Sequence, residues 1–362
     1  MGLKCGIIGL ANTGKTTLFN CVANTKVHNQ PGMQKANIGQ INVPDNRLLE
    51  IDKLVHSARV VTATVDLVDI PGMSKGSGQT DSGSSRFLAD IQQTDALIHV
   101  IRCFDSDTVP HIEGSVNPVR DKEIVDLELC IRDLGMVDRK IQRTDKLLKI
   151  GDKDAKKTME ILHIYKTHLE DFKPARTAPV SIDDRKQIAD MYLITDKPVI
   201  YVCNVDDASA VNGNQYSDKL REAVKDENTE VLIIAAEMEA EIAELEDPED
   251  RAVFLADAGL ADPGVNKVVS SAYRLLNLQS FFTAGPMEVR AWTIHKGMSA
   301  PKAAGVIHSD LERGFIRAEV MHYDDFMKYK TEHACREAGK LLVEGKNYLV
   351  GDGDILHIRF NV

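Results

Sequence analysis

The sequence predicts an α/β fold: a doubly wound, mostly parallel sheet, an inserted helical pair and a small β-rich module. In the first part, short apolar segments alternate with helix-like segments, as in doubly wound domains. Between roughly 121 and 187, apolar residues recur at heptad-like spacing and predict two long antiparallel helices broken at Gly151-Asp152. From about residue 279 the pattern becomes β-rich, with Gly-containing turns and no alternating helices. We therefore expect three parts, at residues 1–120 with 188–278, 121–187, and 279–362.

The first predicted strand leads into a phosphate-binding loop. Gly9-Leu-Ala-Asn-Thr-Gly-Lys-Thr16 matches G-x-x-x-x-G-K-[ST], with an apolar strand before it and a helix-like segment after it. Glycines in such a loop let backbone N–H groups point at phosphate oxygens, and the helix N-terminus adds partial positive charge. Lys15 is expected to reach the outer phosphates, and the Thr16 hydroxyl to ligate Mg²⁺. The predicted nucleotide-binding residues of this loop are Asn12, Thr13, Gly14, Lys15, Thr16 and Thr17.

Further strands end in polar residues that point to the same site. The apolar segments Val60–Asp69, Asp95–Arg102, Lys197–Asn204 and Glu230–Ala236 read as strands. In open parallel sheets the ligand lies beyond the carboxyl ends of the strands. We therefore expect nucleotide contacts from Asp69, Asn204 and the region of Ala235.

Asp69-Ile-Pro-Gly72 fits the D-x-x-G element of P-loop GTPase-like proteins. Its acid is expected to hold Mg²⁺ together with Thr16, and the Gly72 N–H to sense the γ-phosphate. Lys15 and Gly72 are thus the predicted catalytic residues. Met73 follows, where Ras-type proteins carry a Gln that orients the attacking water. Either Met73 only packs against the sheet, or the enzyme is slow alone and another group or a partner positions its water.

Asn204-Val-Asp-Asp207 stands at the predicted base-reading position. In GTPases the equivalent N-K-x-D uses its last carboxylate to accept both guanine N–H donors. We predict base contacts from Asn204, Asp207 and the Val205 backbone. The chemistry favours guanine, and a simple strand-end turn of Asn and Asp is the alternative.

Composition restricts the class of protein. The chain has 362 residues, so two or three domains are expected, and its 43% hydrophobic and 27% charged residues are typical of a soluble protein. Six cysteines without C-x-x-C pairs favour reduced thiols and a cytoplasmic location, and no long apolar run predicts a membrane span. A net charge of −11 argues against a dedicated, nonspecific nucleic-acid binder, and no DNA partner is expected, but a local basic face that docks on a ribonucleoprotein is not excluded. The helical pair either packs only on itself or forms an arm that contacts a partner.

Taken together, the motifs resemble those of the Obg-like ATPase (YchF) family, within the translation-factor-related P-loop proteins. The resemblance covers nearly the whole chain, and its C-terminal part is the most specific. The residues that carry it are Gly9–Thr17, Asp69–Gly72, Cys103–Asp105, Gly114–Ile124, Asn204–Asp207, Phe281–Ile294, Ala300–His308 and Arg313–Val320.

This resemblance implies a P-loop G domain, an inserted antiparallel coiled coil and a C-terminal TGS (β-grasp) domain. It also implies Mg²⁺-dependent hydrolysis of ATP and association with the ribosome, through the large subunit or the intact particle. Asn12 matches an Asn that binds K⁺ in related GTPases, so stimulation by K⁺ is expected.

The chain departs from the family pattern in a Ser-rich loop at residues 75–85, in Thr16 where Ser is usual, and at two positions that bear on the base and the metal. The family usually has Glu where this chain has Asp207, and a switch Thr where it has Met33. The first change restores the acid that guanine-specific proteins use, and the second removes a hydroxyl that can ligate Mg²⁺. A slow ATPase is the preferred hypothesis. The alternatives are a GTPase of the same fold and a nucleotide-dependent binding module with negligible hydrolysis.

Overall fold

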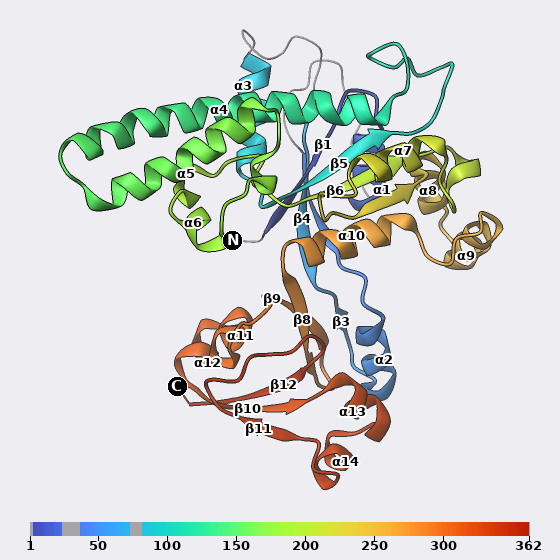
Figure 1. The fold of residues 1–362 in the computed structure, drawn as a ribbon. Helices are drawn as coiled ribbons and strands as arrows, with labels where there is room; N and C mark the ends of the chain where they lie inside the picture. Colours follow the sequence, from blue (N-terminus) through green and yellow to red (C-terminus); the bar gives the residue numbers. More distant parts are fainter. Residues whose placement is uncertain (1–2, 24–36, 73–81, 362) are drawn as a thin grey trace. The chain divides into compact units, whose positions relative to one another are not determined.

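The computed structural model describes residues 3–23, 37–72 and 82–361. The chain divides into two units, each with its own six-stranded sheet (Figure 1). The first unit comprises Met1–Gly39 with Asp66–Val268, and the second comprises Gln40–Val65 with Val269–Val362.

The first unit is built on a sheet with the strand order β2-β4-β1-β5-β6-β7. Each pair of neighbouring strands from β4 to β7 in this order is parallel. The central strands β1, β5 and β6 are almost entirely buried. This arrangement confirms the predicted doubly wound α/β fold. Its elements are β1 (Lys4–Ile8), α1 (Lys15–Ala23), β2 (Asn37–Asn42), β4 (Thr64–Asp69), α3 (Ser82–Gln92), β5 (Ala96–Arg102), α4 (Pro118–Lys149), α5 (Lys153–Glu170), α6 (Ile182–Lys186), β6 (Val199–Asn204), α7 (Gln215–Ala223), β7 (Val231–Ile234), α8 (Ala236–Glu244), α9 (Pro248–Asp257), the start of α10 (Gly264–Leu275), and the 3₁₀ turns η1 (Ala175–Thr177), η2 (Ala189–Met191) and η3 (Asp207–Ser209).

The inserted helices α4 and α5 lie side by side as an antiparallel pair (Figure 1). We call this pair the arm. Its two helices meet through buried apolar side chains, among them Val137 of α4 and Leu162 and Tyr165 of α5. Gly151, with φ 84°, ends the first helix, and the Asp152 carboxylate caps the second. The predicted break between the helices is confirmed.

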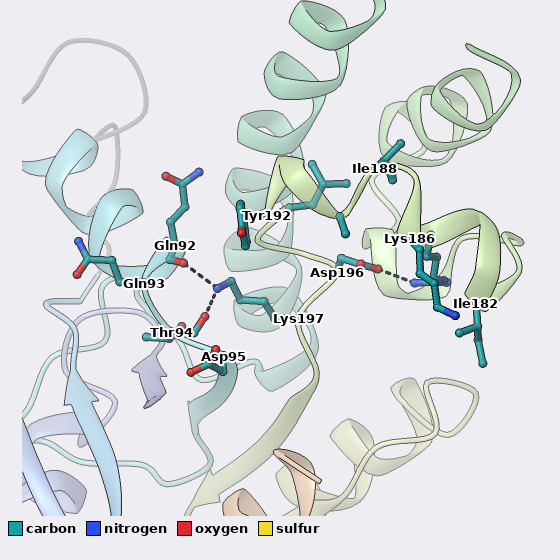
Figure 2. A pocket seen from close by; sticks show the side chains of 13 residues that line it. Gln92, Gln93, Thr94, Asp95, Ile182, Lys186, Ile188, Tyr192, Asp196 and Lys197 are labelled. Atoms are coloured by element: carbon teal, nitrogen blue, oxygen red, sulfur yellow. Dashed lines mark hydrogen bonds and ion pairs between the residues drawn. The ribbon is translucent and has the colours of Figure 1, made fainter. Parts of the chain in front are cut away.

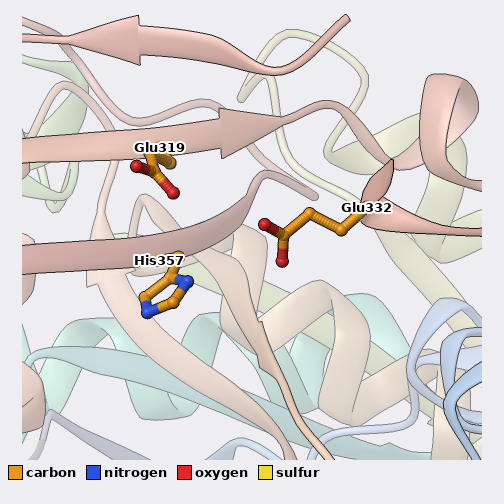
Figure 3. Close-up of side chains that lie close together, drawn as sticks. All are labelled: Glu319, Glu332 and His357. Atoms are coloured by element: carbon orange, nitrogen blue, oxygen red, sulfur yellow. The ribbon is translucent and has the colours of Figure 1, made fainter. Parts of the chain in front are cut away.

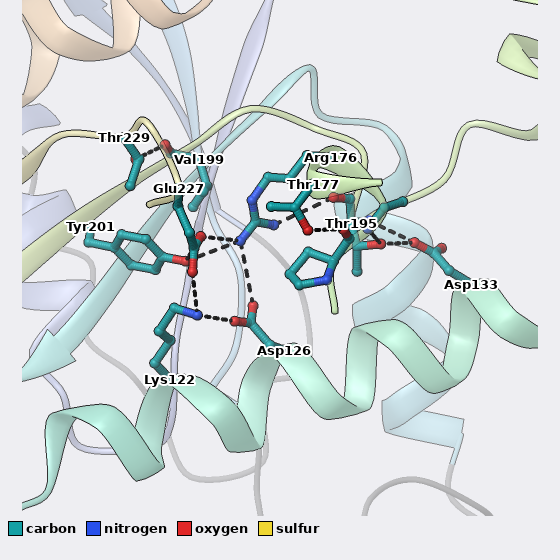
Figure 4. A network of polar contacts seen from close by, with 12 residues as sticks. Lys122, Asp126, Asp133, Arg176, Thr177, Thr195, Val199, Tyr201, Glu227 and Thr229 are labelled. Atoms are coloured by element: carbon teal, nitrogen blue, oxygen red, sulfur yellow. Dashed lines mark hydrogen bonds and ion pairs between the residues drawn. The ribbon is translucent and has the colours of Figure 1, made fainter. Parts of the chain in front are cut away.

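Buried charged groups attach the root of the arm to the sheet (Figure 4). The Lys122 ammonium of α4 contacts Asp126 and Glu227, each at 2.7 Å. Glu227 also accepts hydrogen bonds from Tyr201 of β6 at 2.9 Å and from Arg176 at 3.0 Å. Because each buried charge has a partner of opposite sign, removing one of them would leave another uncompensated.

The second unit contains an antiparallel core, with strand order β11-β10-β12-β8-β9-β3. The antiparallel pairs are β10 with β11, β10 with β12 and β8 with β9. Its elements are α2 (Asn46–Val55), β3 (Val60–Val61), β8 (Leu278–Ala284), β9 (Val289–His295), α11 (Ala300–Ile307), α12 (Ser309–Arg313), β10 (Phe315–Met321), α13 (Tyr323–Tyr329), α14 (Glu332–Glu337), β11 (Leu342–Glu344) and β12 (Ile355–Phe360).

Residues 40–65 belong to this second unit, although the sequence analysis assigned them to the first part. The segment Val60–Asp69 forms two strands rather than one, and β3 pairs in parallel with β9 at Val60 and Val289. Arg47 of α2 contacts the Asp352 carboxylate at 2.9 Å and lies 5.3 Å from the centre of the Phe282 ring. These long-range contacts leave no periodic signal in the sequence.

The expectation that alternating helices disappear after about residue 279 is wrong. Four short helices, α11 to α14, lie in this part of the chain. The small residues Ala300, Ala303 and Ala304 of α11 are fully buried in the core against Phe281 and Ile294. Their close packing, rather than a long amphipathic pattern, makes this segment helical.

Asp133 provides a test of the attachment of the arm. Its buried carboxylate accepts hydrogen bonds from the Ile194 N–H at 2.9 Å, the Thr195 N–H at 2.7 Å and the Thr195 hydroxyl at 2.6 Å. Burial raises the pKa of Asp133, and these hydrogen bonds oppose that shift. Asp133→Asn places an amide N–H₂ against these donors and should lower the free energy of unfolding by roughly 2–4 kcal/mol in urea denaturation.

The matched control is Asp145→Asn, because Asp145 lies on the same helix in a half-exposed pair with Lys149. It should change stability by less than about 1 kcal/mol. Equal effects of the two substitutions would contradict the proposed attachment.

Candidate nucleotide site

The predicted phosphate-binding loop lies at the carboxyl end of β1, directly before α1. Gly9 has φ 146°, and a Cβ there would lie 2.3 Å from the Val100 carbonyl oxygen, so only glycine fits. Thr13 is buried, and its hydroxyl donates to the Leu10 carbonyl at 3.1 Å. The loop therefore has the strained, glycine-dependent geometry that the sequence motif requires.

Lys15 is the first residue of α1 and is buried. Its ammonium donates to the carbonyl oxygen of Leu10 within the same loop. Burial lowers the pKa of Lys15 to about 8, and the negative charge of Asp69 opposes this shift. The predicted phosphate-binding cation thus lies inside the loop, beside the predicted magnesium ligand.

Thr16 and Asp69 are brought together, as a shared metal site requires. The Thr16 hydroxyl lies 3.0 Å from Asp69 Oδ2. The other oxygen, Oδ1, is buried and has no hydrogen-bond partner among the described residues. Burial raises the pKa of Asp69, while the Thr16 hydroxyl, the charge of Lys15 and the Asn37 side chain oppose that shift. A carboxylate with an unused buried oxygen, next to a hydroxyl, fits Mg²⁺, which prefers oxygen ligands.

Gly72 lies against the phosphate-binding loop. A Cβ at this position would lie 2.7 Å from Lys15 Nζ and 3.0 Å from the Ala11 Cα. The backbone of the Asp69–Gly72 segment therefore approaches the loop as closely as a glycine permits. Met33 and Met73, which the sequence analysis discussed beside this site, lie outside the described residues.

Asn204 connects the end of β6 to two neighbouring loops. Its Nδ2 donates to the Thr13 carbonyl at 3.0 Å, and its Oδ1 accepts from the Ala236 N–H at 3.1 Å. A Cβ on Gly14, which has φ 90°, would lie 2.2 Å from Asn204 Nδ2. Both ends of the amide are therefore engaged by protein groups, so its role here is to join loops.

The other residues predicted to bind the nucleotide differ in whether their polar groups are free to contact it. The Val205 side chain is buried in the core, and its N–H donates to the Ile234 carbonyl at 2.8 Å. Asp207 is exposed at the start of η3, and among the described residues no hydrogen bond or ion pair engages its carboxylate. Thr17 lies in the first turn of α1 and is half-buried. Of the predicted base-reading side chains, only Asp207 is therefore left to read a base.

Two other features do not belong to this site. A pocket of about 440 Å³ is lined by residues that precede β5 and β6, including Thr94, Asp95 and Lys197 (Figure 2). It therefore lies at the amino ends of the strands, whereas Asp69 and Asn204 lie at the carboxyl ends. In Figure 2, the Lys197 ammonium points at the carbonyl oxygens of Gln92, which it contacts at 3.0 Å, and of Thr94.

The second feature is a group of possible metal ligands in the second unit, Glu319, Glu332 and His357 (Figure 3). Arg359 donates to both Glu319 oxygens, at 3.2 and 3.0 Å. Arg336 also contacts Glu332 at 2.9 Å. Because arginines already use these carboxylates, the group does not fit a divalent cation.

The chain matches known protein families over most of its length. A model described as "50S ribosome-binding GTPase" matches residues 4–205. A second model, for the C-terminal domain of YchF GTPases and described as "Protein of unknown function (DUF933)", matches residues 278–361. The chain is 45% identical to the "Ribosome-binding ATPase YchF" of Haemophilus ducreyi and 42% identical to that of Bacillus subtilis, with 100% of each chain covered. The chain belongs to the YchF family.

A solved structure of the YchF GTPase of Schizosaccharomyces pombe agrees with this assignment. Its TM-score to this chain is 0.87 at 31% sequence identity, over 99% of this chain and 98% of that one. The predicted fold class and the predicted family resemblance are both confirmed.

A loop that no sequence motif indicates contacts the phosphate-binding loop in this YchF chain. Asn12, with φ 61°, donates through Nδ2 to the Pro110 carbonyl at 3.2 Å. The next residue, His111, contacts the buried Asp121 carboxylate at 2.8 Å in the first turn of α4. The family motifs on both sides of this loop were noted, but a contact between positions 98 residues apart gives no local signal.

The pairing of Thr16 with Asp69 can be tested by magnesium-dependent binding. Asp69→Asn should remove most of the gain in ATP affinity that Mg²⁺ gives, a loss of about tenfold or more, corresponding to about 1.4 kcal/mol. ATP affinity in EDTA should change little, because the phosphate-binding loop is unaltered. Isothermal titration calorimetry with and without Mg²⁺ measures both quantities.

Asp66→Asn serves as the control, since Asp66 lies three residues earlier on β4. It should leave the magnesium effect intact. An Asp69→Asn protein that still gains full affinity from Mg²⁺ would exclude Asp69 as a ligand.

Proposed function

We propose that this protein is a Mg²⁺-dependent P-loop ATPase that hydrolyses ATP slowly and acts as a ribosome-associated switch in the cytoplasm. The observation that carries the proposal is the group formed by Lys15, Thr16, Asp69 and Gly72, in which Lys15 and Asp69 are buried. It combines a phosphate-binding cation, two oxygen ligands for a metal and a backbone that reaches the loop. Relatives over the full chain length are named ribosome-binding ATPases.

In the proposed reaction each residue has one role. Lys15 and the loop amides bind and stabilise the phosphates, which favours charge build-up in the transition state. Thr16 and Asp69 hold Mg²⁺, which when bound neutralises phosphate charge. The Gly72 N–H responds to the γ-phosphate, so that the backbone at Gly72 reports the state of the nucleotide. Met73 offers no group that orients water, which is the reason for expecting slow turnover.

The preference for adenine or guanine decides between an ATPase and the alternative function, a GTPase. Guanine presents two adjacent N–H donors to one carboxylate, and Asp207 is an accessible, unengaged carboxylate. Adenine offers one donor and one acceptor on the corresponding edge, so it gains less from a carboxylate. The names of the full-length relatives nevertheless support ATP.

The ribosome, through its large subunit or as the intact particle, is the proposed partner. Stimulation by K⁺ is proposed through Asn12, whose Nδ2 is bonded to Pro110 and whose Oδ1 is the atom suited to a cation. Among the described residues, no helix has the length and apolar character needed to cross a bilayer.

Competition between ATP and GTP tests the proposal directly. The unmodified protein should bind Mg·ATP at least fivefold more tightly than Mg·GTP, a difference of about 1 kcal/mol. Asp207→Glu should keep or increase this preference, and Asp206→Glu, next to it, should leave it unchanged. Fluorescent nucleotide displacement measures the affinities, and phosphate release with and without ribosomes measures turnover.

A preference for GTP that Asp207→Glu reverses would make the protein a GTPase. No phosphate release under either condition would leave only a nucleotide-dependent binding module.

A further inference from the structure

The outer face of α4 carries a row of exposed basic residues. Arg132, Arg139, Arg143 and Lys146 are all exposed and repeat at the three-, four- and seven-residue spacings that place side chains on one helix face. We call these four residues the basic stripe. It extends about 20 Å along the helix. The residues of α4 that pack against α5, such as Val137, lie on the opposite face.

The stripe is not neutralised by the protein. Among the described residues, none of its four cations forms an ion pair, whereas Lys140 and Lys149 on other sides of α4 pair with Asp190 and Asp145. The four stripe residues carry a charge of +4 on one helix face. The whole chain has a net charge of −11. A concentrated positive face on an acidic protein indicates an anionic partner.

This face is also held rigidly. α4 packs on the sheet through Val125 and Leu129, and on α5 through Cys130 and Val137. Lys122 and Asp133 fix its root to the rest of the unit (Figure 4). Cations at fixed spacing on a rigid helix lose little entropy when they meet a regular row of charges.

We propose that the basic stripe binds the phosphate backbone of ribosomal RNA. This inference rests on the proposed function and names the surface and the chemistry of its ribosome contact. The stripe contains three arginines and one lysine. The apolar side chain between them on this face, Met136, packs against the core of the arm, and the exposed Leu147 and Ile150 lie only at the C-terminal end of the stripe. Protein–protein interfaces usually have apolar and aromatic centres, whereas contacts with RNA phosphates are made by such cations.

A charge-reversal series tests the stripe. In the triple variant Arg139→Glu, Arg143→Glu and Lys146→Glu, affinity for purified ribosomes should fall at least tenfold in co-sedimentation. The slope of log affinity against log salt should become flatter by roughly 2, since three phosphate contacts are lost. ATP affinity and the thermal midpoint should stay unchanged. The corresponding triple Gln variant, which removes charge without reversing it, should give a smaller loss in the same direction.

The matched control changes charge by the same amount outside the stripe. Lys156→Glu, Lys173→Glu and Lys186→Glu alter exposed residues on α5, after α5 and on α6. This control should bind ribosomes nearly as well as the unmodified protein. Protein-free ribosomal RNA should compete for the unmodified protein and not for the triple Glu variant.

Each alternative result has a distinct meaning. If the unmodified protein binds ribosomes and the stripe variant binds equally well with the same salt slope, the stripe inference is wrong and the proposed function stands. If the stripe variant loses binding but protein-free RNA does not compete, the anionic partner is a protein and the RNA assignment is wrong. If the unmodified protein does not bind ribosomes at all, the proposed function fails, and the inference fails with it.

Discussion

The two hydrogen bonds of the Asn204 amide hold the candidate site together. One joins the end of β6 to the phosphate-binding loop at Thr13, and the other joins it to the first turn of α8 at Ala236. The amide approaches the loop so closely that position 14 cannot carry a side chain. Lys15 and Thr16 follow directly, so their positions relative to Asp69 depend on this contact. Because each bond is buried, losing either leaves a polar group unsatisfied at a cost of about 1–3 kcal/mol.

β6 connects this site to the arm. The strand carries Asn204 at its carboxyl end and Tyr201 three residues earlier, where the Tyr201 hydroxyl donates to Glu227 within the buried charge group at the arm root. A second connection runs from Asn12 to Pro110, and from His111 to Asp121 in the first turn of α4. The phosphate-binding loop and the arm are therefore joined through two short chains of polar contacts. Rigid attachment of this kind is what a helix needs in order to present a fixed row of charges to a partner.

The sequence predicted the parts whose physical causes are local. Gly9 and Gly14 are required by backbone geometry, Gly151-Asp152 breaks a helical pattern, and Asp69 ends a buried strand, and each of these leaves a pattern in the sequence. The association of residues 40–65 with the second unit could not be predicted, because it depends on pairing between Val60 and Val289 and on the contact between Arg47 and Asp352. The structural role of Asn204 was missed for a similar reason. A motif indicates that an Asn is present at a strand end, but only the fold determines that both ends of its amide are already used.

Amide hydrogen exchange of Asn204→Asp without nucleotide is the measurement that tests this account most directly. The substituted carboxylate can still accept from the Ala236 N–H, but it repels the Thr13 carbonyl. We expect exchange of the loop amides at residues 9–16 to become about tenfold faster, while amides at the start of α8 stay protected. Unchanged exchange in the loop would contradict the claim that Asn204 holds the candidate site together.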